Sequence, residues 1–480
     1  MDRKTFLKST AIVAGAIFAK PSGLRAAELH PVGDSGRPEN PKLAHAEKII
    51  FPVGEDVEIR IPIPDKYSNV AENFKILCAG DDGGFFAAND APYLKAKNEI
   101  PFSFDGSTLS IKISFPREQR YTFLIYNKNL KDIKDRNFDL MAKVYALNSD
   151  IFQLTPFKCD FHMHSTGSDG KETPVEAGIK CMETGFDYQS LSDHSNYSSS
   201  VELMKEFKGL PISMNVYMAE EIHKSVAHIL VVGASDSVTN YIAANKAEFD
   251  KSCDKYLKSL TGEFNDEERQ IIARAMAEID IAHKLKGYTV FAHPYWRLGA
   301  ERIGQRLGTG INSYLSDRTI DALLMKCNFD AVEAVNATAR DEQTDMMTAT
   351  ISEFKSHGRD IPIIGVSDAH HPDQHGKGYT IAFAKTNAFN DIWSAIKSYN
   401  NVAVDSPGDG TTPIILGRRR FVRFAFFLLE EYFPLHDILC AKQAEVLSKI
   451  LKGGRSPELM ESLKNLGDQT KALYASMRYS

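Results

Sequence analysis

The sequence has no closely spaced cysteines, no large excess of charge of one sign and no apolar run long enough to span a bilayer. Its six cysteines, at positions 78, 159, 181, 253, 327 and 440, include no Cys-x-x-Cys pair, which excludes a disulfide-rich framework and a cysteine-ligated zinc site. We expect buried thiols, with one disulfide between Cys159 and Cys181 as the alternative. The net charge of -6 gives the chain no general attraction to nucleic acid or anionic lipid.

The first 27 residues have the layout of a secretory signal peptide, because basic residues at 3, 4 and 8 precede an apolar run at 11–19. That run is too short to cross a bilayer as a helix. Arg3–Lys8 resembles the twin-arginine export motif with Lys4 in place of the second arginine, so twin-arginine and general secretory export both stay open. We predict cleavage near Ala26 or Ala27, a periplasmic location and no transmembrane segment afterwards. The alternative is a short N-terminal helix of a cytoplasmic protein.

The length of 480 residues predicts two or three domains, because a single core stops growing at about 250–300 residues. Residues 28–46 are rich in proline, glycine and charge and are interpreted as a linker. Residues 47–155 alternate with period two, as in 57–61 and 109–115, and Asp105-Gly106 marks a hairpin. We predict a small all-β sandwich there.

Residues 157–410 alternate short apolar runs with helical stretches, which predicts an α/β domain with much parallel sheet. Thr173-Pro174-Val175-Glu176 predicts a helix start with a capping box, and residues 266–286 form an amphipathic stretch. Most of the six apolar runs end in His, Asp or Asn; they are 157–164, 186–194, 227–233, 288–293, 329–336 and 361–370. Reacting groups of barrel-like α/β folds cluster at the carboxyl ends of strands, so we expect these polar residues to converge.

Residues 411–480 are predicted to form a helical appendage. An arginine triplet at 418–420 precedes a Phe-rich run at 421–429, and two amphipathic stretches follow, broken at Gly453-Gly454. We expect the Phe-rich run to be buried against the α/β domain. A homodimer interface and a membrane-surface contact are the alternatives.

The polar residues at the predicted strand ends are histidines and carboxylates, which are common metal ligands. His162 and His164 are two residues apart and therefore project to the same face of a strand. The candidate ligands are His162, His164, Asp169, His194, Glu221, His228, His293, Asp368 and His370. They exceed the roughly four to six donors that one divalent ion binds, which predicts two or three ions sharing a bridging carboxylate.

The order of these motifs resembles the polymerase and histidinol phosphatase (PHP) superfamily of metal-dependent phosphoesterases, over about residues 157–410. The motifs are His162-Met163-His164, Ser192-Asp193-His194, Glu221 shortly before His228, Ala292-His293-Pro294 and Ser367-Asp368-Ala369-His370. The resemblance implies a distorted seven-stranded (β/α) barrel that holds two or three manganese, zinc or iron ions. Ser168-Asp169-Gly170 is similar to the nucleotidase and exonuclease branch of the family.

By similarity, each ion would have its own ligand set: His162, His164, Glu221 and Asp368 for the first; Glu221, His228 and His293 for the second; Asp169, His194 and His370 for the third. One position departs from the family pattern. Ala219 stands where a glycine usually lies two residues before the bridging glutamate, which leaves Glu220 as the alternative to Glu221.

The resemblance implies hydrolysis of a phosphomonoester or small nucleotide by metal-activated hydroxide at a di- or trinuclear site. Asp193, next to a ligand histidine, is a candidate orienting residue. Arg297 and Lys171 are candidates to bind phosphate. The expected partner is a small phosphorylated substrate, and no stable nucleic-acid partner is expected for an acidic chain.

Two other functions stay open from the sequence. One is an amidohydrolase-like hydrolase that attacks another bond with the same ions. The other is an exported glycan- or partner-binding protein with a vestigial metal site, in which the β-sandwich does the binding.

Overall fold

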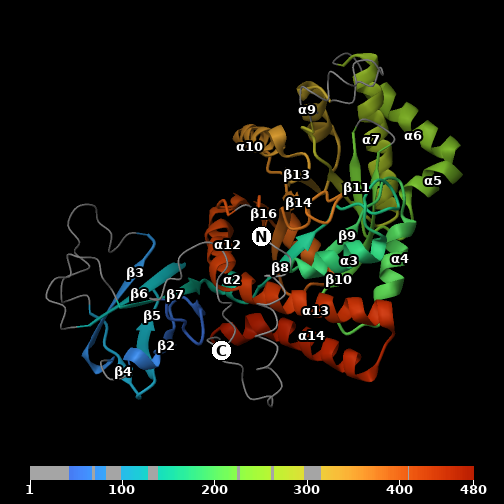
Figure 1. The fold of residues 1–480 in the computed structure, drawn as a ribbon. Helices are drawn as coiled ribbons and strands as arrows, with labels where there is room; N and C mark the ends of the chain where they lie inside the picture. Colours follow the sequence, from blue (N-terminus) through green and yellow to red (C-terminus); the bar gives the residue numbers. More distant parts are fainter. Residues whose placement is uncertain are drawn as a thin grey trace. The chain divides into compact units, whose positions relative to one another are not determined.

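The computed structural model describes residues 43–67, 71–82, 99–127, 139–223, 227–260, 264–296, 315–408 and 410–480. The chain divides into two compact units (Figure 1). The first comprises the described residues up to Ile49 with Asp56–Ser114 and Tyr121–Val144, and the second comprises Ile50–Glu55, Phe115–Arg120 and Tyr145–Ser480. The predicted signal peptide and most of the predicted linker lie outside the described residues.

The first unit is built from strands, as its alternating sequence predicts, and several of them pair antiparallel. A three-stranded sheet has the order β2 (Asp56–Pro62), β5 (Thr108–Ser114), β4 (Ser103–Phe104). The hairpin turn between β4 and β5 uses Gly106 at φ +97°, and the Asp105 carboxylate accepts from the backbone N–H groups of Ser107 and Thr108. Separately, β3 (Phe74–Gly80) pairs antiparallel with β6 (Gln119–Asn127). The packing of these strands as a sandwich stays a prediction.

The second unit is built around a ten-stranded sheet with the order β14-β13-β12-β11-β10-β9-β8-β15-β16-β17. The strands are β8 (Thr155–Asp160), β9 (Tyr188–Leu191), β10 (Asn215–Ile222), β11 (Ile229–Val232), β12 (Tyr288–Phe291), β13 (Ala331–Asn336), β14 (Ile363–Val366), β15 (Gly378–Ala384), β16 (Asn401–Asp405) and β17 (Ile414–Gly417). It also contains β1 (Ile50–Pro52), which pairs in parallel with the end of β7 (Leu140–Leu147).

The strand pairing is mixed: the sheet contains the parallel pairs that the sequence predicts, together with antiparallel pairs. Strands β8, β9 and β10 are parallel, as are β12, β13 and β14, but β11 is antiparallel to both of its neighbours. Residues 223–228 are too few for the crossover that a parallel β10–β11 pair requires, so the chain turns back on itself. Strands β15, β16 and β17 extend the sheet in antiparallel fashion from β8.

The sheet curls back on itself into a nearly closed barrel. Just beyond β8 and β14, Met163 and Ala369 form a parallel bridge. His164 N–H donates to the Ala369 carbonyl at 2.8 Å, and Asp368 N–H donates to the His162 carbonyl at 2.9 Å. The ends of two strands that are distant in the sheet order therefore lie side by side.

Helices surround this sheet (Figure 1). They are α2 (Ser149–Phe152), α3 (Pro174–Glu183), α4 (Ser198–Phe207), α5 (Val238–Ala244), α6 (Lys246–Ser259), α7 (Asp266–Lys284), α9 (Asp317–Lys326), α10 (Arg340–Ser356), α11 (Phe389–Lys397), α12 (Arg419–Glu431), α13 (Phe433–Gly453) and α14 (Pro457–Met477). Helix α3 begins with the predicted capping box, in which the side chains of Thr173 and Glu176 bond each other's backbone N–H groups. No helix among the described residues is both long and apolar enough to span a membrane.

The C-terminal helices pack within the second unit. Phe421, Phe424 and Phe427 of α12 are buried, and the Phe424 ring lies 5.6 Å from Phe383 of β15. The predicted burial of the Phe-rich run against the α/β domain is therefore confirmed. Helix α13 packs against α3 and α14, which run side by side with it in Figure 1. All six cysteines are free, so the alternative Cys159–Cys181 disulfide is absent.

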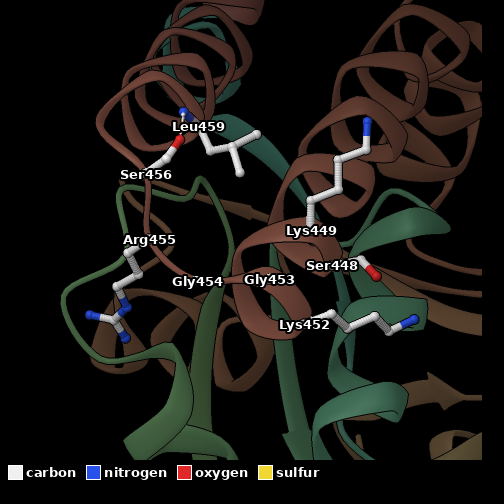
Figure 2. Close-up of a pocket in the computed structure, with 8 residues that line it drawn as sticks. All are labelled: Ser448, Lys449, Lys452, Gly453, Gly454, Arg455, Ser456 and Leu459. Carbon is white, nitrogen blue, oxygen red and sulfur yellow. Dashed lines mark hydrogen bonds between the residues drawn. The ribbon is translucent and has the colours of Figure 1, made fainter.

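A pocket of about 700 Å³ lies at the turn between α13 and α14 (Figure 2). Lys449, Lys452 and Arg455 give it a basic lining, but none of the residues that line it is buried. The basic side chains of the pocket are therefore exposed to solvent, and of its lining residues Ser456 is held as the N-cap of α14.

Candidate metal centre

All nine candidate ligands come together at one edge of the barrel-like sheet. Seven of them follow the carboxyl ends of β8, β9, β12 and β14, and Glu221 is the second-last residue of β10. His228 precedes β11, and it joins the cluster because that strand is antiparallel and so presents its amino end at the same edge. The convergence predicted from the strand-end positions is therefore present for every candidate.

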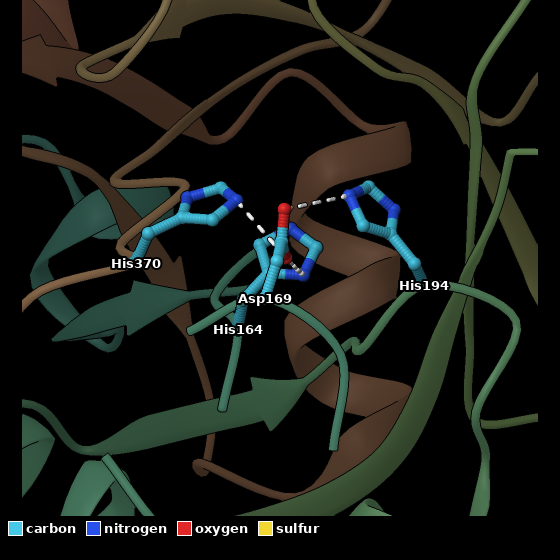
Figure 3. A group of neighbouring side chains, drawn as sticks. All are labelled: His164, Asp169, His194 and His370. Carbon is cyan, nitrogen blue, oxygen red and sulfur yellow. Dashed lines mark ion pairs between the residues drawn. The ribbon is translucent and has the colours of Figure 1, made fainter. Parts of the chain in front are cut away.

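The nine side chains form four overlapping groups, in each of which the donor atoms lie within 4.8 Å of one another. The groups are His162, His164 and Asp368; His162, Glu221 and His293; His194, Glu221 and His228; and His164, Asp169, His194 and His370. Figure 3 shows the last group, in which Asp169 lies between His370 and His194. Its Oδ1 is 3.4 Å from His370 Nε2, and its Oδ2 is 3.7 Å from His194 Nε2.

Glu221 occupies the centre of the cluster. Its Oε2 lies 3.2 Å from His162 Nε2 and 2.8 Å from His194 Nδ1. Its Oε1 lies 2.9 Å from His228 Nδ1 and 3.1 Å from His293 Nε2. Each carboxylate oxygen therefore faces a different set of histidines, which is the geometry of a bridging carboxylate.

Glu220 faces the opposite side of β10, because successive residues of a strand project to opposite faces. Its Oε1 accepts from Val238 N–H and its Oε2 from the Ser237 hydroxyl, at the start of α5. Of the two adjacent glutamates, only Glu221 points at the cluster.

The cluster fits divalent cations on the evidence of its buried lone pairs. Glu221 Oε2 and Asp368 Oδ1 are buried and accept no hydrogen bond from the described residues. His162 Nδ1 lies 2.7 Å from Glu333 Oε1, so this nitrogen carries the proton and Nε2 carries a lone pair. That Nε2 is only 3.1 Å from His164 Nε2. Buried lone pairs that face one another are unfavourable unless a positive charge lies between them. A set of imidazole and carboxylate ligands suits zinc, manganese or iron.

The pKa shifts of Glu221 and His164 agree with a site that concentrates negative potential, whereas burial lowers the pKa of His228. Burial alone would raise the pKa of Glu221, but the imidazoles of His162 and His228 outweigh it and hold this pKa well below its ordinary value. Burial lowers the pKa of His164, yet the Asp368 and Glu221 carboxylates, 3.1 and 3.3 Å from its Nε2, reverse the effect and raise this pKa to about 9. The surroundings therefore stabilise a positive charge among these side chains.

Two of the candidate ligands have left-handed backbone conformations. His293 has φ +26° and Asp368 has φ +51°. Such conformations cost about 1–3 kcal/mol for a non-glycine residue and persist where surrounding bonds enforce them. Here the N–H of each is held, by the Glu333 carboxylate and the His162 carbonyl respectively. The backbone strain therefore coincides with the cluster.

Asp193 is buried, and its carboxylate bonds to the loop after β8 and not to an imidazole of the cluster. It accepts from Ser165 N–H at 2.7 Å, from the Ser165 hydroxyl at 2.5 Å and from the Ser168 hydroxyl at 2.6 Å. It therefore fixes the loop that carries Asp169. Lys171 is exposed, and its backbone N–H donates to the His370 carbonyl. Arg297 lies outside the described residues.

Several residues near the cluster were not predicted from the sequence as site residues. Glu333 and Asn336 are completely buried in β13 and bond to candidate ligands. The Trp296 ring lies edge-on to His293 at 5.9 Å, and the His223 ring lies 4.4 Å from that of His194. The one sequence signal was Glu333 itself, a charged residue within the apolar run 329–336.

Comparison with known proteins gives a partial match. No family model matches the chain. The chain is 26% identical over 266 residues to DNA polymerase/3'-5' exonuclease PolX of Bacillus subtilis (strain 168), a match that covers 54% of this chain and 42% of that protein. The chain thus spans less than half the length of this relative.

Three solved structures are similar to parts of the chain. One is a two-domain protein from Bacteroides vulgatus containing a predicted PHP-like metal-dependent phosphoesterase (19% identity, 57% of this chain and 70% of that chain, TM-score 0.38). Another is described as a metal-dependent phosphoesterase from Bifidobacterium adolescentis (18% identity, 44% and 87%, TM-score 0.30). The third is an amidohydrolase from Chromobacterium violaceum (16% identity, 45% and 89%, TM-score 0.28).

Proposed function

We propose that this protein is a PHP-type metal-dependent phosphoesterase that hydrolyses a phosphomonoester or a small nucleotide. The observation that carries the proposal is the position of Glu221, whose two buried oxygens face two different sets of histidines. A carboxylate so placed suits two ions, and Asp169, His194 and His370 suit a third. The bridge between Met163 and Ala369 supports an interpretation of β8 to β14 as the seven-stranded barrel that the resemblance implies.

Each group of side chains has its own part in this proposal. His162, His164 and Asp368 would hold one ion with Glu221, and His228 and His293 would hold a second on its other oxygen. Bound ions would neutralise charge on the phosphate oxygens and lower the pKa of water from 15.7 to about 7. The chain itself fixes the ligands. The His370 imidazole, for example, donates from Nδ1 to the Asp368 carbonyl at 2.8 Å, which directs Nε2 toward Asp169.

The candidate ligands differ in their exposure to solvent, so the cluster has a buried side and an exposed side. His162, His164, Glu221 and Asp368 are buried, whereas Asp169 is exposed and His194 and His370 are partly exposed. A phosphorylated substrate would therefore approach from the side of Asp169. The buried ligands would remain shielded from bulk water.

The proposal is tested by metal analysis followed by an assay with p-nitrophenyl phosphate in the presence of manganese, zinc or iron. We expect about two or more ions per chain and measurable turnover. Glu221→Gln should lower turnover by about 100-fold or more, the scale seen when one electrostatic stabiliser is removed. Glu220→Gln is the matched control, because this neighbouring glutamate faces away from the cluster, and it should retain activity.

Two results would contradict the proposal. Metal content below about one ion per chain would favour a binding protein with a vestigial site. Full metal content without turnover of any phosphate ester, whichever metal is supplied, would favour hydrolysis of another bond. The proposed periplasmic location rests on the N-terminal sequence, and fractionation of cells that express the full chain would test it.

A further inference from the structure

Glu333 of β13 connects three of the proposed ligand segments without itself reaching the cluster of donor atoms. Its side chain is completely buried. Oε1 lies 2.7 Å from His162 Nδ1, and Oε2 accepts from His293 N–H at 2.8 Å and from Asn336 Nδ2 at 2.9 Å. The Asn336 amide also donates to Asp368 Oδ2 at 3.1 Å. Contacts from one strand therefore reach His162, His293 and Asp368.

An irregularity of β13 makes this arrangement possible. In a regular strand, residues three apart project to opposite faces, so Glu333 and Asn336 could not both face the cluster. The register of β13 against β14 shifts between Glu333 and Val335, as a β-bulge does. Bulges often redirect a side chain next to a functional site. Here the shift brings Glu333 and Asn336 to the same side.

The surroundings hold both side chains in place. Gln343 of α10 is buried, and its Nε2 donates to the Glu333 carbonyl at 2.6 Å while its Oε1 accepts from Tyr295 N–H at 2.8 Å. Asn336 Oδ1 accepts from the N–H groups of Thr338 and Ala339. This fixes the orientation of the Asn336 amide, so its NH₂ group must point at Glu333 and Asp368.

Only a carboxylate can satisfy the three donors around Glu333. Its two oxygens accept from an imidazole N–H, a backbone N–H and an amide NH₂, whereas a carboxamide would place its own NH₂ against one of these donors. The bond to His162 Nδ1 also fixes the tautomer of that ring and leaves the Nε2 lone pair facing the cluster. Such a bond raises the basicity of a metal-binding imidazole.

We infer that Glu333 and Asn336 are positioning residues that orient His162, His293 and Asp368 for metal binding. The inference rests on the proposed function, because it takes these three residues to be ligands. It adds two residues that would act through the ligands and not on the substrate.

The test measures metal affinity directly. Metal-free wild type and Glu333→Gln are titrated with zinc or manganese against a chromophoric chelator, and folding is checked by circular dichroism. We expect the variant to bind metal about 10- to 100-fold more weakly, the usual effect of losing such a partner. With saturating metal, kcat should fall more than KM rises, because the variant misplaces the ligands and leaves the substrate-binding surface intact.

Glu220→Gln is again the matched control. Glu220 is as buried as Glu333 and also accepts several hydrogen bonds, but its partners belong to the start of α5. We expect this variant to lose thermal stability without a change in metal affinity. If Glu333→Gln does not fold, Asn336→Ser decides the question, because it removes the bond to Asp368 and leaves the Glu333–His162 bond in place.

The outcomes separate the inference from the proposed function. Wild type that binds no metal would overturn both. Wild type that binds metal and hydrolyses phosphate esters, together with variants of Glu333 and Asn336 that bind metal equally tightly, would overturn the inference alone. A fall in melting temperature at unchanged metal affinity would likewise assign these two residues a structural role only.

Discussion

Glu278 of α7 is completely buried, and its closest charged partner is Arg274, whose Nε lies 2.8 Å from Oε1. Burial raises the pKa of Glu278 to about 7, against a smaller opposing effect of Arg274. A carboxyl group with a raised pKa binds its proton more tightly in the folded chain than in the unfolded one. Its contribution to stability is therefore complete below about pH 4.5 and is lost as the pH rises through about 7.

We predict that the free energy of unfolding falls between pH 5 and pH 8 by an amount on the order of 2–3 kcal/mol through this residue. Glu278→Gln cannot ionise and should lose less stability over the same range. Urea denaturation of both proteins at the two pH values measures the difference. Parallel pH dependences would show that Glu278 is ionised throughout in the folded state.

At the scale of elements, the start of α13 is joined to the barrel-like sheet by one buried and one partly buried ion pair. Lys158 of β8 is buried, and its Nζ lies 2.7 Å from Asp437 Oδ2. At the preceding residue of α13, His436 Nε2 lies 2.9 Å from Asp187 Oδ1. The Lys158 ammonium also lies 5.1 Å from the centre of the Phe433 ring. Two consecutive residues of α13 therefore neutralise charges that β8 and the residue before β9 would otherwise bury alone.

We predict that Asp437→Leu lowers the free energy of unfolding by about 3–5 kcal/mol, because it leaves the buried Lys158 ammonium unpaired. Lys158→Met should cost less, because the Asp437 side chain that it leaves is 36% exposed. The double variant should be more stable than the sum of the two losses implies, since it buries no charge. Denaturant unfolding of the wild type, the two single variants and the double variant gives the four free energies of this double-mutant cycle. Additive losses would mean that the Lys158–Asp437 pair contributes no specific interaction.

At the scale of the whole molecule, the candidate metal centre draws its ligands from segments spread between His162 and His370, so bound ions would stabilise the fold of the second unit as a whole. A ligand that binds only the folded chain adds about 2.7 kcal/mol at a concentration 100 times its dissociation constant. We predict that removing metal with EDTA lowers the melting temperature and that zinc or manganese restores it. Calorimetry should show a smaller shift for Glu221→Gln. Identical melting temperatures with and without chelator would contradict a metal centre of this kind.

The sequence predicts the local features of this molecule well and the long-range ones poorly. Alternation locates β2 and β5, and the capping box locates the start of α3, because these signals lie within a few residues. Strand β10 was not among the predicted strands, since Glu220 and Glu221 interrupt its apolar residues. The position of β15 beside β8 and the antiparallel course of β11 depend on pairing between distant segments, which no local pattern encodes.

The same distinction holds within the candidate site. All nine candidate ligands could be named from the sequence, eight of them in or shortly after the apolar runs and Glu221 from its position shortly before His228. Which of Glu220 and Glu221 faces the cluster depends on the pleat of β10. Asn336 ends one of the apolar runs and Glu333 lies within it, but their common orientation toward the ligands depends on the register shift in β13, which the sequence does not show. The hydrogen bonds from Ser165 and Ser168 to Asp193 likewise join segments that are distant in the sequence, so no local pattern predicts them.

The bridge between Met163 and Ala369 has a consequence for the order of events during synthesis. Roughly 200 residues separate its two sides, so the ribosome must add about another 10–40 s of chain after His162 and His164 before their partners near Asp368 exist. During that interval the two histidines have no complete ligand set to join. The ions would then be acquired by a nearly finished chain, and a nascent chain that stalls before Asp368 would release a protein unable to retain them.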